Sequence, residues 1–107
     1  MATSPDYVEF VCEQIKDVGT VRYRKMFGEY MVYVDDRPVL LVCDNMVYVK
    51  IRDEISGLMQ GAETGRPYEG AKEHYLLDVE NGQLAKNVTS ILTAVTPVPK
   101  QKKKIKK

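Results

Sequence analysis

The residues of this chain with the most distinctive chemistry are the lysines at its C-terminal end. The last eight residues contain six lysines and no acidic residue, whereas the ninety-nine before them carry ten basic and fifteen acidic side chains. A flexible cationic segment of this kind predicts weak binding to DNA or RNA without sequence preference. The alternative is a solubilising terminus, or one that folds back on the acidic body. The candidate nucleic-acid contacts in this tail are Lys100, Lys102, Lys103, Lys104, Lys106 and Lys107.

A second basic group, formed by Arg22, Arg24 and Lys25, lies on a predicted strand. Side chains alternate between the two faces of a strand, so Arg22 and Arg24 share one face, while Lys25 points the other way with Tyr23. This group is a candidate contact for phosphates or for a partner protein. The alternative is a charged strand surface that blocks pairing with the edges of other chains.

Tyrosine is frequent in this sequence, with seven tyrosines against two phenylalanines and no tryptophan. Its ring is apolar and its hydroxyl is polar, so a half-exposed face rich in tyrosine suits either a subunit interface or the stacking of bases. We favour the interface and expect a homodimer, with Tyr30, Tyr33 and Tyr48 as candidate interface residues. A regulatory protein partner is a further expected interaction.

Residues that could support catalysis or hold a metal ion are few and far apart. His74 is the only histidine, and no familiar ligand spacing makes a zinc site from it and the two cysteines. No serine or cysteine lies in a nucleophile motif. The acidic turns at 35–36 and 44–45 lack the alternating ligands of a calcium loop. We therefore expect no catalytic residue and no metal site.

Hydropathy and cysteine content bear on the cellular compartment. The sequence has no run of about 18 apolar residues that could span a membrane, and its N-terminus lacks the basic-then-apolar pattern of a signal peptide. We expect a cytoplasmic protein with no membrane contact. In a reducing cytoplasm, Cys12 and Cys43 are expected to be buried thiols rather than a disulfide.

The basic and tyrosine-rich segments must be positioned by strands that follow an N-terminal helix. Ser4 and Pro5 predict the start of that helix, and apolar residues at every third or fourth position extend it to about Val18, before Gly19. The short connections between the strands that follow allow only antiparallel pairing, as a meander. Alternating β-branched and aromatic residues predict these strands at 21–27, 30–34, 39–43 and 46–51.

Two further segments complete the predicted sheet and its cover. Residues 53–62 predict a short helix with Ile55, Leu58 and Met59 turned inward, although its central glycine costs about 1 kcal/mol. A loop rich in glycine and proline follows. Residues 73–79 then predict another strand.

The best-patterned segment is the final helix, which begins at Asn81 and ends before Pro97. Its apolar residues recur at i, i+4, i+7, i+8 and i+11, the spacing of a stripe that faces a core. In the strand at 46–51, alternation likewise turns one set of side chains to the core: Val47, Val49 and Ile51.

The order of elements is helix, three or four strands, helix, one or two strands, helix. This order predicts an α+β fold, a two-layer sandwich of an antiparallel meander sheet with helices on one face. The chain has 107 residues, 44% of them hydrophobic, and we expect one folded domain over residues 1–96. Residues 97–107 hold too few apolar side chains to become ordered, so we expect a disordered lysine-rich tail.

Several segments resemble the N-terminal domain of the TfoX (Sxy) family of competence regulators. They are residues 21–30 (VRYRKMFGEY), 33–35 (YVD), 41–50 (LVCDNMVYVK) and 70–76 (GAKEHYL). The resemblance covers about residues 6–95. It implies a bacterial α+β protein with a fold similar to that of secretion chaperones, a link to DNA uptake and transcription, and neither cofactor nor catalytic residues. Glu29 and Met31 stand where the family usually has glycine.

Two function hypotheses follow from the residues and the resemblance. In the first, the protein is a non-catalytic TfoX-like regulator linked to competence and transcription, and its lysine tail adds weak contact with nucleic acid. Full-length regulators of this type continue into a helical C-terminal domain, whereas this sequence ends in the tail. In the second, the protein is an interaction module or chaperone-like adaptor that binds another polypeptide, and the tail has no nucleic-acid role.

Overall fold

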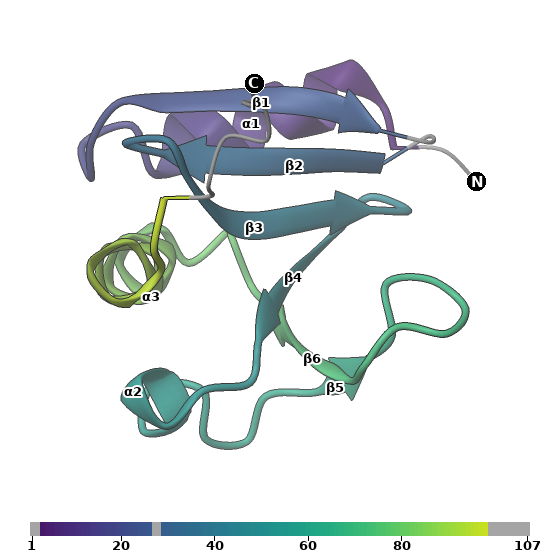
Figure 1. Ribbon diagram of the computed structural model, residues 1–107, viewed down its shortest axis with the longest axis vertical. Coiled ribbons are helices and arrows are strands. Elements are labelled where there is room, and N and C mark those ends of the chain that lie inside the picture. Colours follow the sequence, from purple (N-terminus) through teal and green to yellow (C-terminus); the bar gives the residue numbers. More distant parts are fainter. Residues whose placement is uncertain (1–2, 27–28, 99–107) are drawn as a thin grey trace, which may run out of the picture.

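The centre of the molecule is an antiparallel sheet. The computed structural model describes residues 3–26 and 29–98 (Figure 1). Within these ranges the sheet has six strands in the order β1-β2-β3-β4-β6-β5, and each neighbouring pair is antiparallel. The strands are β1 (Val21–Met26), β2 (Glu29–Val34), β3 (Arg37–Cys43), β4 (Met46–Lys50), β5 (Thr64–Gly65) and β6 (His74–Leu77).

The helices found in the same ranges pack against one face of this sheet. They are α1 (Pro5–Gln14), α2 (Asp53–Ser56) and α3 (Gly82–Val95). Their buried side chains form one core cluster with the inward side chains of β2, β3, β4 and β6. Figure 1 shows α1 behind β1 and β2, and α3 beside the start of β3. The predicted α+β fold with an antiparallel meander is confirmed.

Hydrophobic periodicity predicted the main core positions. Val88 and Leu92 of α3 are 0% and 2% exposed, and Val47 and Val49 of β4 are each 1% exposed. Ile51, which alternation assigned to the core, is instead 49% exposed. The reason is that β4 ends one residue earlier, so the alternation of the strand no longer fixes the direction of this side chain.

Two tight turns join β2 to β3 and β3 to β4. Asp35 and Asp36 have φ angles of 51° and 68°, and Asp44 and Asn45 both have φ of 59°. Hairpins with two central residues of positive φ match the twist of their strands, and Asp and Asn tolerate this conformation better than other non-glycine residues. The turns predicted at these positions are confirmed, and the first is shorter than expected because β3 already begins at Arg37.

Several element boundaries differ from the sequence prediction. Helix α1 ends at Gln14 rather than at Val18, because the chain changes to turns in which the Val18 amide donates to the Ile15 carbonyl at 3.0 Å. Helix α2 ends at Ser56, where a glycine, a residue of low helix propensity, follows and the chain continues in turns. Leu58 is consequently 38% exposed rather than inward. Strand β6 is shorter than predicted, and β5 was missed because two residues carry no alternation.

The lysine tail at 99–107 lies outside the described residues, so the predicted division into a domain and a disordered tail stays a prediction. In the part of the chain that is described, no helix combines the length and the hydropathy that crossing a bilayer requires.

Candidate functional site

The face of the sheet opposite the core carries several of the predicted basic and tyrosine residues. Directly paired residues of an antiparallel sheet have their side chains on the same face. Arg24 pairs with Met31, Met31 with Leu41, and Leu41 with Tyr48. The row continues from Tyr48 to Leu76 on β6. We call this surface the outer face and define it by these five residues.

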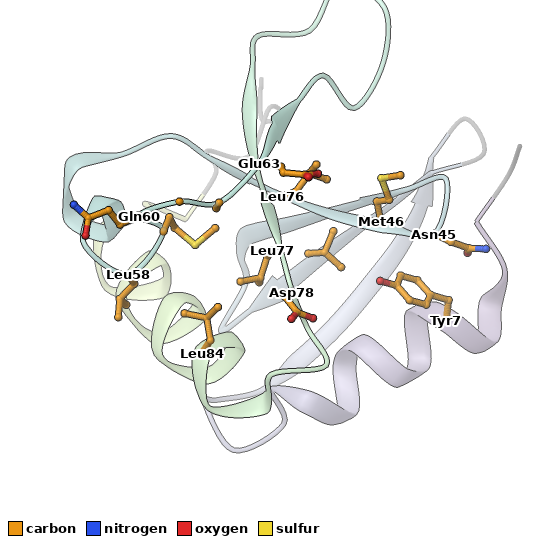
Figure 2. A pocket seen from close by; sticks show the side chains of 14 residues that line it. Tyr7, Asn45, Met46, Leu58, Gln60, Glu63, Leu76, Leu77, Asp78 and Leu84 are labelled. Atoms are coloured by element: carbon orange, nitrogen blue, oxygen red, sulfur yellow. The ribbon is translucent and has the colours of Figure 1, made fainter.

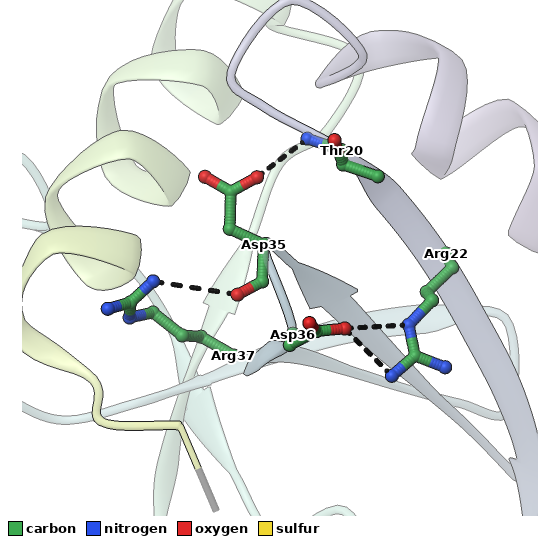
Figure 3. A network of polar contacts seen from close by, with 5 residues as sticks. All are labelled: Thr20, Arg22, Asp35, Asp36 and Arg37. Carbon is green, nitrogen blue, oxygen red and sulfur yellow. Dashed lines mark hydrogen bonds and ion pairs between the residues drawn. The ribbon is translucent and has the colours of Figure 1, made fainter.

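Arg22 is tied to the turn between β2 and β3 (Figure 3). Its Nε and Nη2 donate to Oδ1 of Asp36 at 3.2 and 3.0 Å, and its guanidinium carbon lies 5.1 Å from the ring centroid of Tyr33. Beside it, the Asp35 carboxylate accepts from the main-chain nitrogen of Thr20 at 2.9 Å. Arg22 therefore stabilises the turn between β2 and β3, and the Asp36 carboxylate neutralises its charge.

The other residues of the predicted site are divided between the two faces. Arg24 is exposed on the outer face and forms no ion pair with a described residue, whereas Lys25 pairs with Tyr30 on the opposite face. Tyr30 is 4% exposed and its ring packs edge-on against a neighbouring tyrosine, so it belongs to the core. Tyr33 is half-buried beneath Arg22, and Tyr48 lies on the outer face, 8% exposed.

A cleft bordered by the outer face and by the end of α3 brings together basic side chains that the sequence analysis did not single out. Its volume is about 440 Å³, within the range of small-ligand sites. Residues of β2, β3 and the end of α3 give it apolar walls, and no aspartate or glutamate lines it. We call it the basic cleft, and its polar and aromatic lining is Tyr48, Lys50, Arg52, Tyr68, Lys72 and His74.

The side chains of the basic cleft are held by the pairing of β4 with β6. Lys50 and His74 are directly paired. Nδ1 of His74 donates to the main-chain oxygen of Lys72 at 2.7 Å, so the neutral ring presents Nε2 as an acceptor. The imidazole stands edge-on to the Tyr48 ring, with centroids 6.5 Å apart. Arg52 pairs with a carboxylate two residues along at 3.2 Å, whereas Lys50 and Lys72 form no ion pair with a described residue.

The loop on one side of the basic cleft is tied to the outer face by Cys43. Its Sγ donates to the carbonyl oxygen of Pro67 at 2.9 Å and lies 3.5 Å from Oε2 of Glu29. Burial, followed by the Glu29 carboxylate, raises the pKa of Cys43 to about 11. Burial, followed by Glu9, also raises the pKa of Cys12 to about 11. Both are free, half-buried thiols that stay protonated at neutral pH, so neither is an activated nucleophile.

Comparison with known proteins bears directly on the resemblance seen in the sequence. The family model of the TfoX N-terminal domain matches residues 13–83. The chain belongs to the TfoX N-terminal domain family. A protein of Spirochaeta aurantia, described as an uncharacterized 12.7 kDa protein in the trpE 5′ region, is 36% identical over 105 residues, which cover 96% of this chain and 91% of that protein. Membership suggests a regulatory role related to competence.

A second hollow of this TfoX domain has the opposite charge (Figure 2). It is a groove of about 480 Å³ whose charged lining residues are Glu63 and Asp78. Met46 and Leu58, which are 46% and 38% exposed, contribute to its apolar lining, as does Tyr7 of α1. Burial, followed by nearby carboxylates, raises the pKa of Tyr7. We call this surface the acidic groove.

The titratable side chains of the TfoX domain do not gather into a metal site within the described residues. In residues 3–26 and 29–98, no group of three or more histidine, cysteine, aspartate or glutamate side chains could hold a metal ion. What these residues do offer is two hollows of opposite charge, one suited to anions and one suited to cationic or apolar groups.

Proposed function

We propose that this chain is a non-catalytic regulatory protein of the TfoX family that acts in the cytoplasm by contacting nucleic acid. The observation that supports this most is the basic cleft, because Lys50 and Lys72 line it without an ion pair to any described residue. Arg24 pairs with Met31, which also lines the cleft. Cations that are not committed to carboxylates are what a phosphate backbone needs. The lysines of the tail add further affinity.

The acidic body does not prevent such a contact, because no aspartate or glutamate lines the cleft. The ninety-nine residues before the tail carry an excess of five negative charges. Outside that lining, Glu54 is neutralised by its ion pair with Arg52. Glu73 accepts a hydrogen bond from Oγ1 of Thr64 at 2.7 Å, which orients its carboxylate but leaves its charge. Since salt screens charges over about 8 to 10 Å, the closest cations dominate the potential at the cleft.

Fluorescence polarisation with labelled DNA and RNA tests this proposal. We expect the double variant Lys50→Glu/Lys72→Glu to bind on the order of tenfold more weakly than the parent, because it reverses two phosphate contacts. The matched control is Lys16→Glu/Lys86→Glu, which reverses Lys16 of the turn after α1, paired with Glu13, and Lys86 of α3, paired with Asp17. Equal losses in the two variants would show that only net charge matters and would reject the cleft.

We also propose that the protein is a homodimer that pairs through β1. This strand is an edge of the sheet, so one side of it has no strand partner among the described residues. Its Tyr23 is 38% exposed, and exposed strand edges readily pair with a second chain. Light scattering should give twice the chain mass of 12.2 kDa, and Tyr23→Lys should lower it. A parent protein that scatters as a monomer at micromolar concentration contradicts the dimer.

The acidic groove supports a second candidate function, an interaction module for another protein. Exposed Met46 and Leu58 beside Glu63 and Asp78 suit a partner segment that is apolar and basic. A stoichiometric protein partner that survives nuclease treatment and is lost in Leu58→Glu would favour this function. Retention of that partner by Leu58→Glu, or recovery of nucleic acid alone, would count against it.

A further inference from the structure

The basic cleft contains an aromatic side chain that is free to receive a ligand. Tyr68 lies in the loop between β5 and β6, lines the cleft and is 52% exposed. Its carbonyl oxygen accepts from the Ala71 amide at 3.1 Å, which closes a turn. No other aromatic ring of the described residues stacks on Tyr68. A large exposed ring that borders a hollow is the kind of surface on which planar ligands stack.

A second part of the lining is also aromatic and is held by contacts with its neighbours. Tyr48 is 8% exposed, and its hydroxyl lies 3.7 Å from the sulfur of Met46. The ring stands edge-on to His74, at an interplanar angle of 85°, and His74 is fixed in turn by its hydrogen bond to Lys72. The cleft therefore has an apolar interior and an aromatic wall. Nε2 of His74 and the tyrosine hydroxyl groups of this wall can form directional hydrogen bonds with a ligand.

The basic cleft combines lysine ammonium groups with tyrosine rings. Lys50 and Lys72 are exposed and line the same hollow as Tyr48 and Tyr68, and no carboxylate lines it. A ligand that satisfies both features has a planar ring and an anionic group a few bonds away. Phosphate suits lysine because the ammonium group is a compact charge with three donors.

We propose that the basic cleft binds one nucleotide unit, with its base against Tyr68 and its phosphate between Lys50 and Lys72. When the nucleotide is part of a nucleic-acid strand, this inference rests on the proposed function and specifies how the strand is bound. A free mononucleotide presents the same chemistry. Bases of a duplex are stacked inside it, so a cleft that receives a base selects single strands over duplexes.

Binding assays on the full chain test the preference for single strands. We expect a ten-residue thymidine oligonucleotide to bind about tenfold more tightly than a duplex of the same length, and Tyr68→Ala to lose about tenfold for the single strand, because each stacked base contributes this much. Tyr68→Phe keeps the ring and should bind as the parent does. The control is Phe10→Ala, which removes a ring of α1 that is 39% exposed and lies outside the cleft.

Amide chemical shifts separate this inference from the proposed function. Uridine monophosphate should shift the amides of Tyr48, Tyr68 and His74, whereas inorganic phosphate should act mainly near Lys50 and Lys72. The nucleotide site is overturned if the mononucleotide shifts none of these amides. It is also overturned if the duplex binds as well as the single strand and Tyr68→Ala changes nothing. In both cases the proposed contact with the phosphate backbone still stands. If the mononucleotide binds and no strand does, the site stands and the proposed function fails.

Discussion

Cys43 donates its thiol hydrogen to the carbonyl oxygen of Pro67 across 2.9 Å. The first residue ends β3 and the second belongs to the loop between β5 and β6, so this contact joins two segments that are 24 residues apart. Tyr68 follows Pro67 directly in the sequence. The thiol therefore helps to set where this exposed ring stands at the basic cleft.

Replacing Cys43 should loosen that loop. We expect Cys43→Ala to lower the free energy of unfolding by about 1 kcal/mol, the net contribution of one hydrogen bond, and to weaken binding of single-stranded DNA. Cys43→Ser keeps a donor and should bind more like the parent. Urea denaturation and polarisation measure the two effects. Cys12→Ala is the control, because its thiol lies on α1 away from the cleft. If Cys12→Ala lost as much DNA binding as Cys43→Ala, this role of the loop would be refuted.

The two thiols should also make stability depend on alkaline pH. Folding raises the pKa of Cys12 and of Cys43 from 9.0 to about 11. Below pH 9 both states hold the proton; above it the unfolded chain ionises first, so the free energy of unfolding falls as pH rises from about 9 to about 11. The raised pKa values of Tyr7 and Tyr48 act in the same direction.

Urea midpoints measured between pH 8 and 10.5 check this dependence. The variant Cys12→Ala/Cys43→Ala should show a shallower decline than the parent, with a remainder from the tyrosines. At pH 8, alkylation of the folded thiols should be roughly a hundredfold slower than in urea, since their thiolate fraction is lower by that factor. Rapid alkylation of the native protein would contradict the protonated thiols.

Two glycines should respond in opposite directions to alanine. At Gly19, a Cβ would lie 2.9 Å from both carboxylate oxygens of Asp35 and from Cγ1 of Val34, so Gly19→Ala should cost about 1 to 3 kcal/mol of stability. At Gly57, whose φ is −66°, a Cβ would meet nothing within 4 Å. Gly57→Ala should therefore stabilise by about 0.5 to 1 kcal/mol. Thermal unfolding of the two variants side by side measures the contrast, and a change of the same sign in both would contradict it.

Two neighbouring isoleucines should differ as strongly. Ile55 of α2 is 0% exposed and Ile51 is 49% exposed. Ile55→Ala should cost about 2 to 5 kcal/mol, because it opens a cavity in the core, whereas Ile51→Ala should change stability by less than about 0.5 kcal/mol. Chemical denaturation gives both values. A large loss of stability in Ile51→Ala would contradict the exposed position of this side chain.

Val49 and Ile51 show how far the sequence predicts the fold. Local periodicity identifies strands and helices because core residues repeat at fixed intervals, and it correctly places Val49. It does not say where a strand stops, so Ile51 was assigned to the core. Alternation places Tyr48 away from the core, but it does not show that Tyr30 of a neighbouring strand faces the core until the pairing of the strands is known.

The basic cleft was missed for a related reason. Alternation already placed Lys50 on the face of Tyr48, away from the core. What brings Lys72 and His74 beside Lys50 is the pairing of β4 with β6, and no local pattern encodes a partner so distant in sequence. The lysine tail is visible in the sequence because its charges are contiguous, whereas the charges of the cleft come from separate segments.

The salt dependence of single-strand binding tests the central claim most directly. Each phosphate contact contributes about 0.7 to the slope of log K against log salt. Lys50 and Lys72 hold one phosphate in the proposed site, so their reversal should reduce the magnitude of that slope by about 0.7, and reversal of Lys16 and Lys86 should leave it nearly unchanged. An unchanged slope in the cleft variant, with normal folding, would contradict the claim that this TfoX-family protein contacts nucleic acid through the basic cleft.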